Sequence, residues 1–328
     1  MTDTLHIRRL LNLDTASRSD LHKYLELRFI REVELFISTK YKEQVFRCPV
    51  HLSVGQEAIA VGVSWNLRKS DKVISTHRSH AHYLAKGGNL FKMFAELLGS
   101  PIGCCGGRGG SMHIFDKSVG FVASIPIVGS SLPIASGLAM AEKLKGSTNV
   151  VVAFIGDASL ETGAFYETLN LAALKQLPLL VVIEDNGYST YASKSVRVSA
   201  ERKSRSLIEG FGIKFLSGNG DNLDEVIEVT REATEIARHG APIVVEFSTF
   251  RLLEHCGPNN DDSLGYRSSD EIESYKYRDP LIPFLERIDS FDKTHFDDEI
   301  SDYVAGQFQR AFDTVKIEYE KFQGIFRP

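Results

Sequence analysis

Short apolar runs alternate with amphipathic stretches along most of the 328-residue chain. Residues 150–155, 179–186 and 242–248 are rich in β-branched and aliphatic side chains, which is typical of strands buried on both faces of a parallel sheet. Residues 161–175 and 222–237 place apolar side chains at helical spacing. Strands and helices that alternate in this way predict an α/β fold, a doubly wound parallel sheet with helices on both faces.

The same pattern predicts further elements before and after this region. They are helices at 19–42, 51–63, 89–98, 132–145, 281–288 and 297–322, strands at 71–76 and 213–216, and a polar surface loop at 188–206. No internal repeat or linker divides the chain. We therefore interpret residues 1–328 as a single domain with N- and C-terminal helices, whose helical tail starts at about residue 277.

The composition excludes several classes of protein. The net charge of −5 gives no general attraction to nucleic acid or to an acidic membrane surface. No apolar run reaches the roughly 18 residues of a membrane span, and the N-terminus lacks the apolar core of a secretion signal. The four cysteines show no paired CxxC spacing, which disfavours a disulfide framework or a zinc site. We expect a cytoplasmic protein that acts on a small molecule.

Polar residues stand where three of the predicted strands end. Gly156 and Asp157 follow the strand at 150–155, and Asn186 ends the strand at 179–186. One βαβ unit therefore places a carboxylate and an amide at neighbouring strand ends, where open α/β sheets bind ligands. Together with a helix N-terminus, these groups suit a hard divalent cation bridged to phosphates. His77 and Arg78 follow the strand at 71–76, and the guanidinium fork of arginine matches phosphate oxygens.

A glycine-rich segment lies between the predicted helices at 89–98 and 132–145. Five of the eight residues at 103–110 are glycine. The segment is either a flexible loop or a backbone that approaches a ligand or a neighbouring chain too closely for Cβ atoms. It matches neither a Walker A motif nor a GxGxxG fingerprint, so it does not indicate simple nucleotide binding.

Six motifs occur in order along the chain. They are HLSVGQEA from residue 51, HRSHAHYLAKGG from 77, GCCGGRGGSMHIFD from 103, PIVG from 126, GDAS from 156 with NLAALKQLPLLVVIEDNGY after it, and TFRLLEH from 249. With these motifs the chain resembles the alpha subunit of the thiamine diphosphate-dependent first component of 2-oxo acid dehydrogenase complexes, of the pyruvate and acetoin dehydrogenase type. The thiamine motif of that family is a Gly-Asp followed by an asparagine nearly thirty residues later, and Asp157 and Asn186 are 29 residues apart.

The resemblance implies a thiamine diphosphate-binding fold, of which this chain is the diphosphate-binding half, with thiamine diphosphate and Mg²⁺ as cofactors. It implies that Asp157, the side chain of Asn186 and the backbone carbonyl of Tyr188 bind Mg²⁺. It also implies that His255 is the catalytic side chain, since imidazole titrates near neutral pH and can move protons during decarboxylation or acyl transfer. The cofactor-binding residues that it implies are His51, His77, Arg78, Val128, Gly156, Asp157, Ala158, Ser159, Asn186, Tyr188, Arg251 and His255.

The resemblance also implies partners. In the family, the glutamate that activates the aminopyrimidine ring lies in a separate pyrimidine-binding half, and this chain contains only one predicted sheet. We therefore expect a beta subunit that carries this half and the catalytic glutamate, in a heterotetramer of two alpha and two beta chains. A lipoyl-bearing acyltransferase is the expected acceptor of the acyl group.

The implied function is oxidative decarboxylation of a pyruvate-like 2-oxo acid, or cleavage of acetoin, with transfer of the acyl group to a lipoyl domain. Two other functions stay open. One is a two-chain thiamine diphosphate-dependent decarboxylase or carboligase in sugar or surface-polysaccharide biosynthesis. The other is a binding subunit without catalysis.

Three positions depart from the family pattern. Pro126 stands where pyruvate dehydrogenases have glycine, which keeps the backbone carbonyl acceptor but removes the N–H donor. Ala158 replaces the second glycine of the usual Gly-Asp-Gly, so the turn must adopt backbone angles that alanine allows. Cys256 stands where animal pyruvate dehydrogenases have a regulatory serine, so we do not expect that phosphorylation switch.

Overall fold

The computed structural model describes residues 20–288 and 290–325. Its main sheet has six strands in the order β2-β1-β3-β4-β8-β7, and all neighbouring strands run parallel. The strands are β1 (Lys72–Ser75), β2 (Phe121–Ser124), β3 (Val151–Gly156), β4 (Leu179–Asp185), β7 (Lys214–Asn219) and β8 (Ile243–Ser248). A separate antiparallel pair joins β5 (Tyr188–Ser189) to β6 (Ala192–Ser193). The predicted fold class is confirmed.

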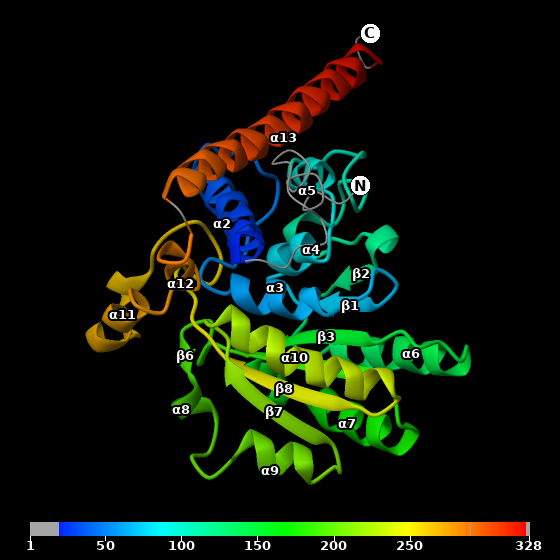
Figure 1. Ribbon diagram of the computed structural model, residues 1–328. Helices are drawn as coiled ribbons and strands as arrows, with labels where there is room; N and C mark the ends of the chain where they lie inside the picture. Colours follow the sequence, from blue (N-terminus) through cyan, green and yellow to red (C-terminus); the bar gives the residue numbers. More distant parts are fainter. Residues whose placement is uncertain (1–19, 289, 326–328) are drawn as a thin grey trace.

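Helices cover both faces of the sheet (Figure 1). Val152 and Phe154 of β3 point into a core shared with α3 (Glu57–Trp65) and α10 (Leu223–Arg238). Val151 and Ile155 point the other way, toward α6 (Ser131–Leu144), α7 (Gly163–Lys175) and α9 (Ser204–Glu209). Because successive side chains of a strand face opposite sides, a continuous apolar run is what a doubly covered sheet requires.

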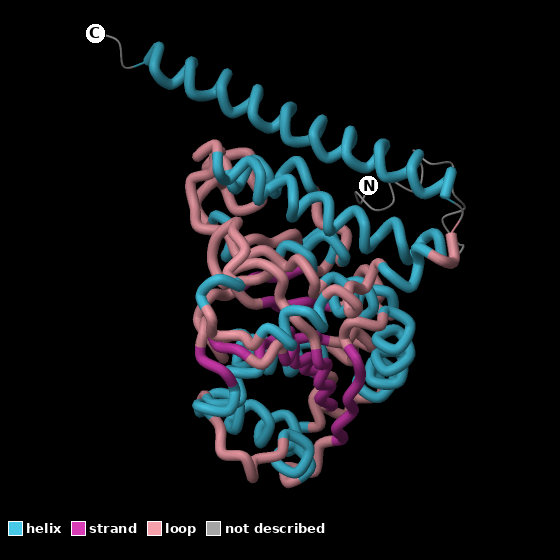
Figure 2. The backbone as a smooth tube through the Cα atoms, turned by 90° about the vertical axis from the view of Figure 1, so that its left-hand side faces the viewer, coloured by secondary structure: helices cyan, strands magenta, loops and turns pink. Residues whose placement is uncertain are grey.

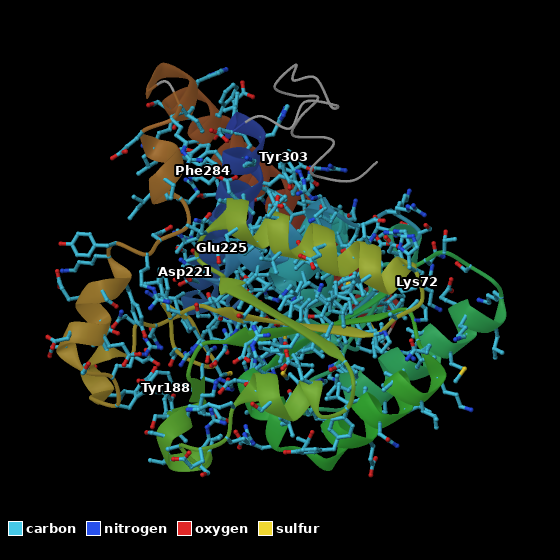
Figure 3. The ribbon with its side chains drawn as sticks, turned by 60° about the horizontal axis from the view of Figure 1, so that its bottom comes forward. Lys72, Tyr188, Asp221, Glu225, Phe284 and Tyr303 are labelled. Atoms are coloured by element: carbon cyan, nitrogen blue, oxygen red, sulfur yellow. The ribbon has the colours of Figure 1, made fainter. Side chains whose placement is uncertain are left out.

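The topology fixes where a ligand can bind. Within the sheet, β1 and β3 are neighbours, but the chain continues from β1 to β2 on one side and from β3 to β4 on the other. In open α/β sheets, ligands bind outside the carboxyl ends of the strands at such a switch point. Figure 3 shows Lys72 at the start of β1 and Tyr188 after β4 on opposite sides of the view, so that Tyr188 marks the carboxyl edge.

The helix predicted at 51–63 begins later than expected. Residues 51–56 are not helical, and α3 starts at Glu57. Gly55 has a φ of +97°, and the segment before it lies beside residues 252–257. The Leu252 N–H donates to the Val54 carbonyl at 3.0 Å, and the Gly257 N–H donates to the Val50 carbonyl at 2.9 Å. The prediction was wrong because these partners lie far away in the sequence, at residues 252–257.

Several short elements were not predicted. They are β2, α4 (His80–Ala85), the 3-10 helices η1 (Gly110–Met112), η2 (Lys117–Val119), η3 (Asp157–Glu161) and η4 (Asp262–Leu264), and α11 (Ser269–Tyr275). The expected surface loop at 188–206 contains β5, β6, α8 (Lys194–Arg197) and the start of α9. Elements of this length give too few periodic positions to be recognised in a sequence.

The C-terminal tail belongs to the main core. The predicted helices at 281–288 and 297–322 correspond to α12 (Ile282–Leu285) and to α13 (Ser290–Ile325), which starts earlier than expected. Figure 2 shows α13 as one long rod along one end of the molecule. Phe308 on α13 makes edge-on ring contacts with Phe36, Phe46 and Phe94. These residues lie on α2 (Asp20–Lys42), after it, and on α5 (Leu90–Leu97). The single-domain boundary stays a prediction.

A buried ion-pair network joins the N-terminal helix to α3 and to the tail. The Arg31 guanidinium pairs with Glu57 at 2.5 Å and with Asp279 at 2.8 Å. Glu57 also accepts the backbone N–H of Gly55 at 3.0 Å, so the network holds the turn before α3. Its two buried members, Arg31 and Glu57, are paired, as buried charges must be.

The glycine-rich segment wraps around a carboxylate of the chain itself. Glu96 on α5 is buried, and its two oxygens accept the backbone N–H groups of Cys105, Gly107, Gly109 and Gly110 at distances between 2.7 and 3.0 Å. At Gly107, φ is +73° and a Cβ atom would lie 2.6 Å from a backbone oxygen. The close approach that the glycines suggested is therefore an approach to Glu96 and to neighbouring backbone.

None of the helices in the described ranges 20–288 and 290–325 combines the length and the apolar character needed to span a membrane. All four cysteines are free thiols.

Candidate functional site

A cavity of about 230 Å³ opens at the carboxyl ends of β1, β3 and β4. It is lined by residues from five separate parts of the chain, around positions 51–56, 76–78, 112–131, 156–159 and 184–190, and by His255. Every site residue predicted from the sequence lines this cavity except Arg251. The predicted residues that meet there are His51, His77, Arg78, Val128, Gly156, Asp157, Ala158, Ser159, Asn186, Tyr188 and His255.

The oxygen ligands lie at the ends of β3 and β4. Asp157 begins η3 directly after β3, and Asn186 follows β4. Gly156 pairs in register with Glu184, so Asp157 and Asn186 are close neighbours across the two strand ends. The Asn186 side-chain oxygen accepts the backbone N–H of Tyr188 at 3.1 Å, which fixes the direction of the amide.

Asp157 is almost fully buried, and its pKa is raised, first by this burial and then by the nearby Asp185 carboxylate. The Arg197 guanidinium opposes the shift. Ala158 lies within the 3-10 turn η3, and its φ angle is negative. The Gly-Asp-Ala turn therefore needs no backbone angle that only glycine can adopt.

Three histidines meet in the lining of the cavity. The ring centroids of His51, His77 and His255 lie 4.8, 5.1 and 5.3 Å apart, and one nitrogen from each ring lies within 4.8 Å of the others. His51 and His255 are brought together by the parallel contact between residues 50–54 and 252–257.

These histidines are neutral at pH 7. Burial is the first cause in each case: with the His77 ring and Arg78 it lowers the pKa of His51 to about 2, and with Arg78 and the His255 ring it lowers that of His77 to about 3. Burial with the charges of Arg78 and Arg251 lowers the pKa of His255 to about 4. Neutral imidazoles offer both a hydrogen-bond donor and an acceptor. His255 is therefore uncharged at neutral pH, but a pKa of about 4 makes it a weaker base than an ordinary imidazole, and its catalytic role stays a prediction.

Arg78 is the main positive charge of the cavity. It is buried; one of its terminal nitrogens donates to the Leu52 carbonyl and the other donates to the His255 carbonyl at 3.0 Å. Burial, with the Arg251 charge, lowers the pKa of Arg78 to about 9, so it is still charged at pH 7. A buried guanidinium in a cavity favours an anionic ligand.

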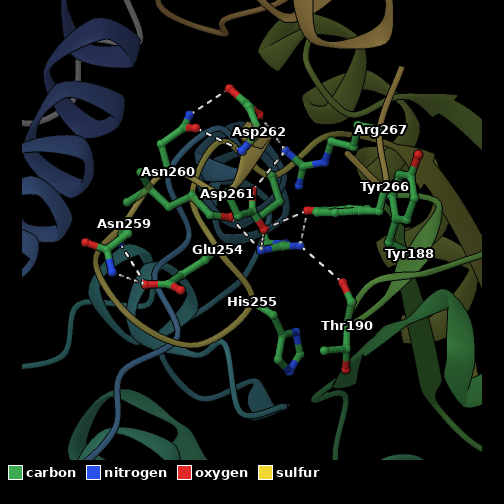
Figure 4. Close-up of polar contacts among 12 residues, drawn as sticks. Tyr188, Thr190, Glu254, His255, Asn259, Asn260, Asp261, Asp262, Tyr266 and Arg267 are labelled. Atoms are coloured by element: carbon green, nitrogen blue, oxygen red, sulfur yellow. Dashed lines mark hydrogen bonds and ion pairs between the residues drawn. The ribbon is translucent and has the colours of Figure 1, made fainter. Parts of the chain in front are cut away.

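Arg251 does not line the cavity. Its guanidinium donates to the Leu253 carbonyl at 2.5 Å, to the Tyr266 hydroxyl at 3.0 Å and to the Thr190 carbonyl at 3.3 Å. It also pairs with buried Asp261 at 3.5 Å. Figure 4 shows this network beside the imidazole ring of His255, which takes no part in it. The structure thus gives Arg251 a part in holding the loop that carries His255, and direct cofactor contact stays a prediction.

Sequence inspection missed Glu184, a buried carboxylate in the cavity wall. Its oxygen lies 3.2 Å from the Nε2 atom of His82, whose ring stacks on Phe154 and whose Nδ1 atom lies 2.7 Å from the Ser75 hydroxyl. A charged residue inside the apolar run of β4 was the available signal. The contact between Glu184 and His82 joins residues that are remote in sequence, so no sequence pattern predicts it.

His80 has a structural partner of its own. Its Nδ1 atom lies 3.0 Å from a Glu34 oxygen and its Nε2 atom lies 2.8 Å from the Ser111 hydroxyl, and all three side chains are buried. Glu34 also accepts the Ser53 backbone N–H at 2.9 Å. This chain of hydrogen bonds connects α2, the segment before α3 and the glycine-rich loop. His80 and His82 thus lie behind the cavity and support its walls, whereas His77 lines the cavity itself.

Comparison with known proteins decides the family. The family model described as dehydrogenase E1 component matches residues 25–317. The chain belongs to this family. A pyruvate dehydrogenase E1 component subunit alpha from Rickettsia bellii is 38% identical over 232 residues, which are 70% of each chain. The corresponding subunit from Rhizobium meliloti is 35% identical over 268 residues, 81% of this chain and 76% of its own length.

A mitochondrial relative from Oryza sativa, named pyruvate dehydrogenase E1 component subunit alpha-1, is 34% identical over 261 residues, 79% of this chain and 65% of its own. These similarities confirm the predicted family, the alpha subunit of a 2-oxo acid dehydrogenase E1 component. Membership implies thiamine diphosphate as the cofactor, a beta subunit and a lipoyl acyltransferase as partners.

Proposed function

We propose that the cavity binds the diphosphate of thiamine diphosphate together with Mg²⁺, and that the chain, with a beta subunit, oxidatively decarboxylates a 2-oxo acid and passes the acyl group to a lipoyl domain. One observation supports this most strongly. Asp157 and Asn186, which are hard oxygen ligands, share one cavity at the β1/β3 switch point with buried Arg78. An anion and a cation bound as a pair suit this set of groups.

The chemistry of the wall fits these cofactors. Asp157, Asn186 and the carbonyl of Tyr188 would hold Mg²⁺, which prefers oxygen ligands, and Arg78 would contact phosphate oxygens. In the described structure, the His51 Nδ1 atom and the Gln56 side-chain oxygen are buried without a hydrogen-bond partner, and both residues line the cavity. Buried polar atoms of this kind are usually paired, so a polar ligand would satisfy them.

When bound, thiamine diphosphate would supply a nucleophilic carbon and a cationic thiazolium ring that takes up the electron pair left by decarboxylation. The chain holds the diphosphate end and keeps neutral His255 in the same cavity. From there the imidazole accepts a proton from, or returns one to, the substrate or the incoming acyl acceptor. Val128, half exposed at the rim, would offer its backbone to the aminopyrimidine ring.

A second chain completes the site in this proposal. Ile127, Val128 and Ile134 have 69%, 49% and 46% of their surface exposed. Ile127 and Val128 line the cavity, and Ile134 lies on α6, whose first residue, Ser131, also lines it. Apolar residues gathered at the rim of a site are typical of a protein interface, and the beta subunit with the catalytic glutamate is the occupant we propose. Assembly as a heterotetramer in the cytoplasm is part of the same proposal.

The relatives named above are called pyruvate dehydrogenase subunits, so pyruvate is the first substrate to test, followed by acetoin. The first experiment is calorimetric titration of the purified chain, alone and with its beta subunit, with thiamine diphosphate in Mg²⁺. We expect binding that disappears when the metal is chelated. The assembled protein should then transfer the acyl group to lipoamide.

Each alternative predicts a different result. Release of free aldehyde, or of a carboligation product in place of acyl-lipoamide, would identify a decarboxylase or carboligase. Failure of the assembled protein to bind thiamine diphosphate would leave only a binding subunit. Robust 2-oxo acid turnover by the alpha chain alone would contradict the need for a beta subunit.

A further inference from the structure

The short helix α8 sends an arginine to the proposed metal ligand. A terminal nitrogen of Arg197 lies 2.5 Å from Asp157 Oδ2, and the other terminal nitrogen pairs with Glu161. The Nε atom donates to the Ala192 carbonyl at 3.1 Å. Each of the three guanidinium nitrogens therefore has a partner, and only 11% of the side chain is exposed. The orientation of Arg197 is thus fixed by its contacts.

Arg197 reaches Asp157 from outside the cavity. Asp157 is part of the cavity lining, whereas the described lining residues do not include Arg197. The guanidinium donates to Oδ2 of Asp157. No hydrogen bond from the described residues reaches Oδ1, the other oxygen of this carboxylate. A cation in the cavity would approach Oδ1 without displacing the arginine.

Glu161 sets the net charge beside the proposed metal ligand, because it pairs with Arg197. A guanidinium alone beside a metal ligand would repel a divalent cation at short range. Glu161 pairs with the same guanidinium, so the two charges offset each other. The pair can therefore fix the direction of the Asp157 carboxylate without adding net positive charge next to the metal.

The same helix also braces the neighbouring strand end. Lys194 pairs with Asp185, the last residue of β4, and lies 3.5 Å from Glu246. Asp185 accepts the Gly187 backbone N–H at 3.1 Å, and the Lys194 backbone N–H donates to the Gly187 carbonyl at 2.8 Å. These contacts shape the turn that presents Asn186. One four-residue helix thus contacts both strand ends that carry the proposed metal ligands.

We propose that Arg197 is a positioning residue for the divalent cation: it holds Asp157 so that Oδ1 faces the cavity, and α8 thereby sets the metal affinity of the site. This inference rests on the proposed function, in which Asp157 binds the cation. Outer-shell partners that orient a metal ligand typically account for roughly 10–100-fold in metal affinity.

The test is Arg197→Gln, measured as the dissociation constant for Mn²⁺ in the presence of saturating thiamine diphosphate, with free Mn²⁺ followed by electron paramagnetic resonance. The assembled protein is used. We expect this constant to rise about 10–100-fold. Arg197→Lys keeps the charge but loses the fork that spans two carboxylates, so it should recover only part of the affinity. Arg205→Gln is the matched control, because Arg205 is an exposed ion-pair partner on the next helix, α9, and should leave the constant unchanged.

The outcomes separate this proposal from the one on which it depends. If the wild type binds Mn²⁺ and folded Arg197→Gln binds it equally well, the positioning role is wrong. If Arg197→Gln binds Mn²⁺ more tightly, Arg197 competes with the metal, which also overturns the proposal. If the wild type binds no metal at all, the proposed function fails, and the positioning role fails with it.

A second variant covers the case in which Arg197→Gln does not fold. Glu161→Gln leaves the Arg197–Asp157 contact in place but removes the charge that offsets the guanidinium. We expect weaker Mn²⁺ binding with an unchanged melting temperature. Unchanged Mn²⁺ binding in this variant would show that the guanidinium charge needs no offset, which would contradict the electrostatic part of the proposal.

Discussion

At the residue scale, the carboxylate of Asp157 is held in place by burial, by an ion pair and by the cavity wall. It is almost fully buried at the end of β3, with one oxygen paired to Arg197 and its side chain in the cavity wall. Burial and the Asp185 carboxylate raise its pKa, and the charges of Arg197 and Lys194 oppose that shift. A residue held in this way is a candidate for function rather than for stability.

The first prediction is that Asp157→Asn prevents retention of the cofactor, because the site loses its only charged metal ligand among the three proposed. The dissociation constant for thiamine diphosphate in Mg²⁺ should rise by more than the roughly 10–100-fold expected for an outer-shell change. Calorimetry on the assembled protein measures this. Asp313→Asn, an exposed change on α13, should behave as wild type, and equal cofactor binding by Asp157→Asn would disprove the metal assignment.

The second prediction concerns pH. Because the pKa of His77 is about 3 in the folded chain and its ordinary value is 6.5, the unfolded chain takes up the proton first as pH falls. The contribution of His77 to stability is therefore complete above pH 6.5 and is lost progressively below it, by up to about 1.4 kcal/mol per pH unit.

Urea unfolding of wild type and His77→Asn at pH 7 and pH 5 isolates this contribution. Between these two values, wild type should lose about 2 kcal/mol more of its free energy of unfolding than the variant does. The difference between the two proteins matters, because carboxylates and the neighbouring His51 and His255, which are common to both, also contribute to the total loss. Parallel pH profiles for the two proteins would show that His77 is not held neutral by the fold.

At the scale of elements, the glycine-rich loop shows how a sequence signal can have an internal cause. The loop bends around Glu96, and its backbone N–H groups converge on that carboxylate. Helix α5 carries Glu96, and Asn89 caps the helix through a hydrogen bond to the Lys92 N–H. The loop therefore depends on one acidic side chain for its conformation.

The third prediction is that Glu96→Ala destabilises the fold by about 3 kcal/mol or more. The four backbone N–H groups lose their acceptor, and each buried donor left unpaired costs roughly 1–3 kcal/mol unless water reaches it. Urea unfolding gives the free energy. Glu232→Ala, on the exposed face of α10, should stay within about 0.5 kcal/mol of wild type. A similarly small effect for Glu96→Ala would mean that the loop does not depend on this carboxylate.

At the scale of the whole molecule, the first and last helices of the described chain, α2 and α13, contribute to one hydrophobic core. Helix α13 packs on α2 and α5, and the core that contains Phe308 and Ile300 also contains Val152 of the central strand β3. Figure 2 shows the long helix lying against the helical layer. The tail therefore packs into the same core as the central strand.

The fourth prediction is that Phe308→Ala lowers the free energy of unfolding by about 3–5 kcal/mol, because it leaves a cavity among the rings of Phe36, Phe46 and Phe94. Thermal and urea unfolding measure the change. Leu144→Ala, at a position with 80% of its surface exposed, is the control and should change stability by less than about 0.5 kcal/mol. If Phe308→Ala matches this control, the tail does not contribute to the main core.

Much of the fold could be predicted because its strands are long enough to show their burial. The runs that became β3, β4 and β8 are apolar on both faces, and the helices between them have clear periodicity. The short elements β2 and α4 lack such a signal. The start of α3 was misplaced because residues 50–54 obtain their backbone partners from residues 252–257.

The sequence by itself determined the α/β class, the family motifs and the residue types at the strand ends, since these depend on local pattern and on order along the chain. The tertiary structure decided which side chains meet. It placed Arg251 behind the cavity, added Glu184 to the wall and paired Arg197 with Asp157 across 40 residues. Contacts of this kind depend on distances between segments that are remote in sequence, and no local periodicity encodes those distances.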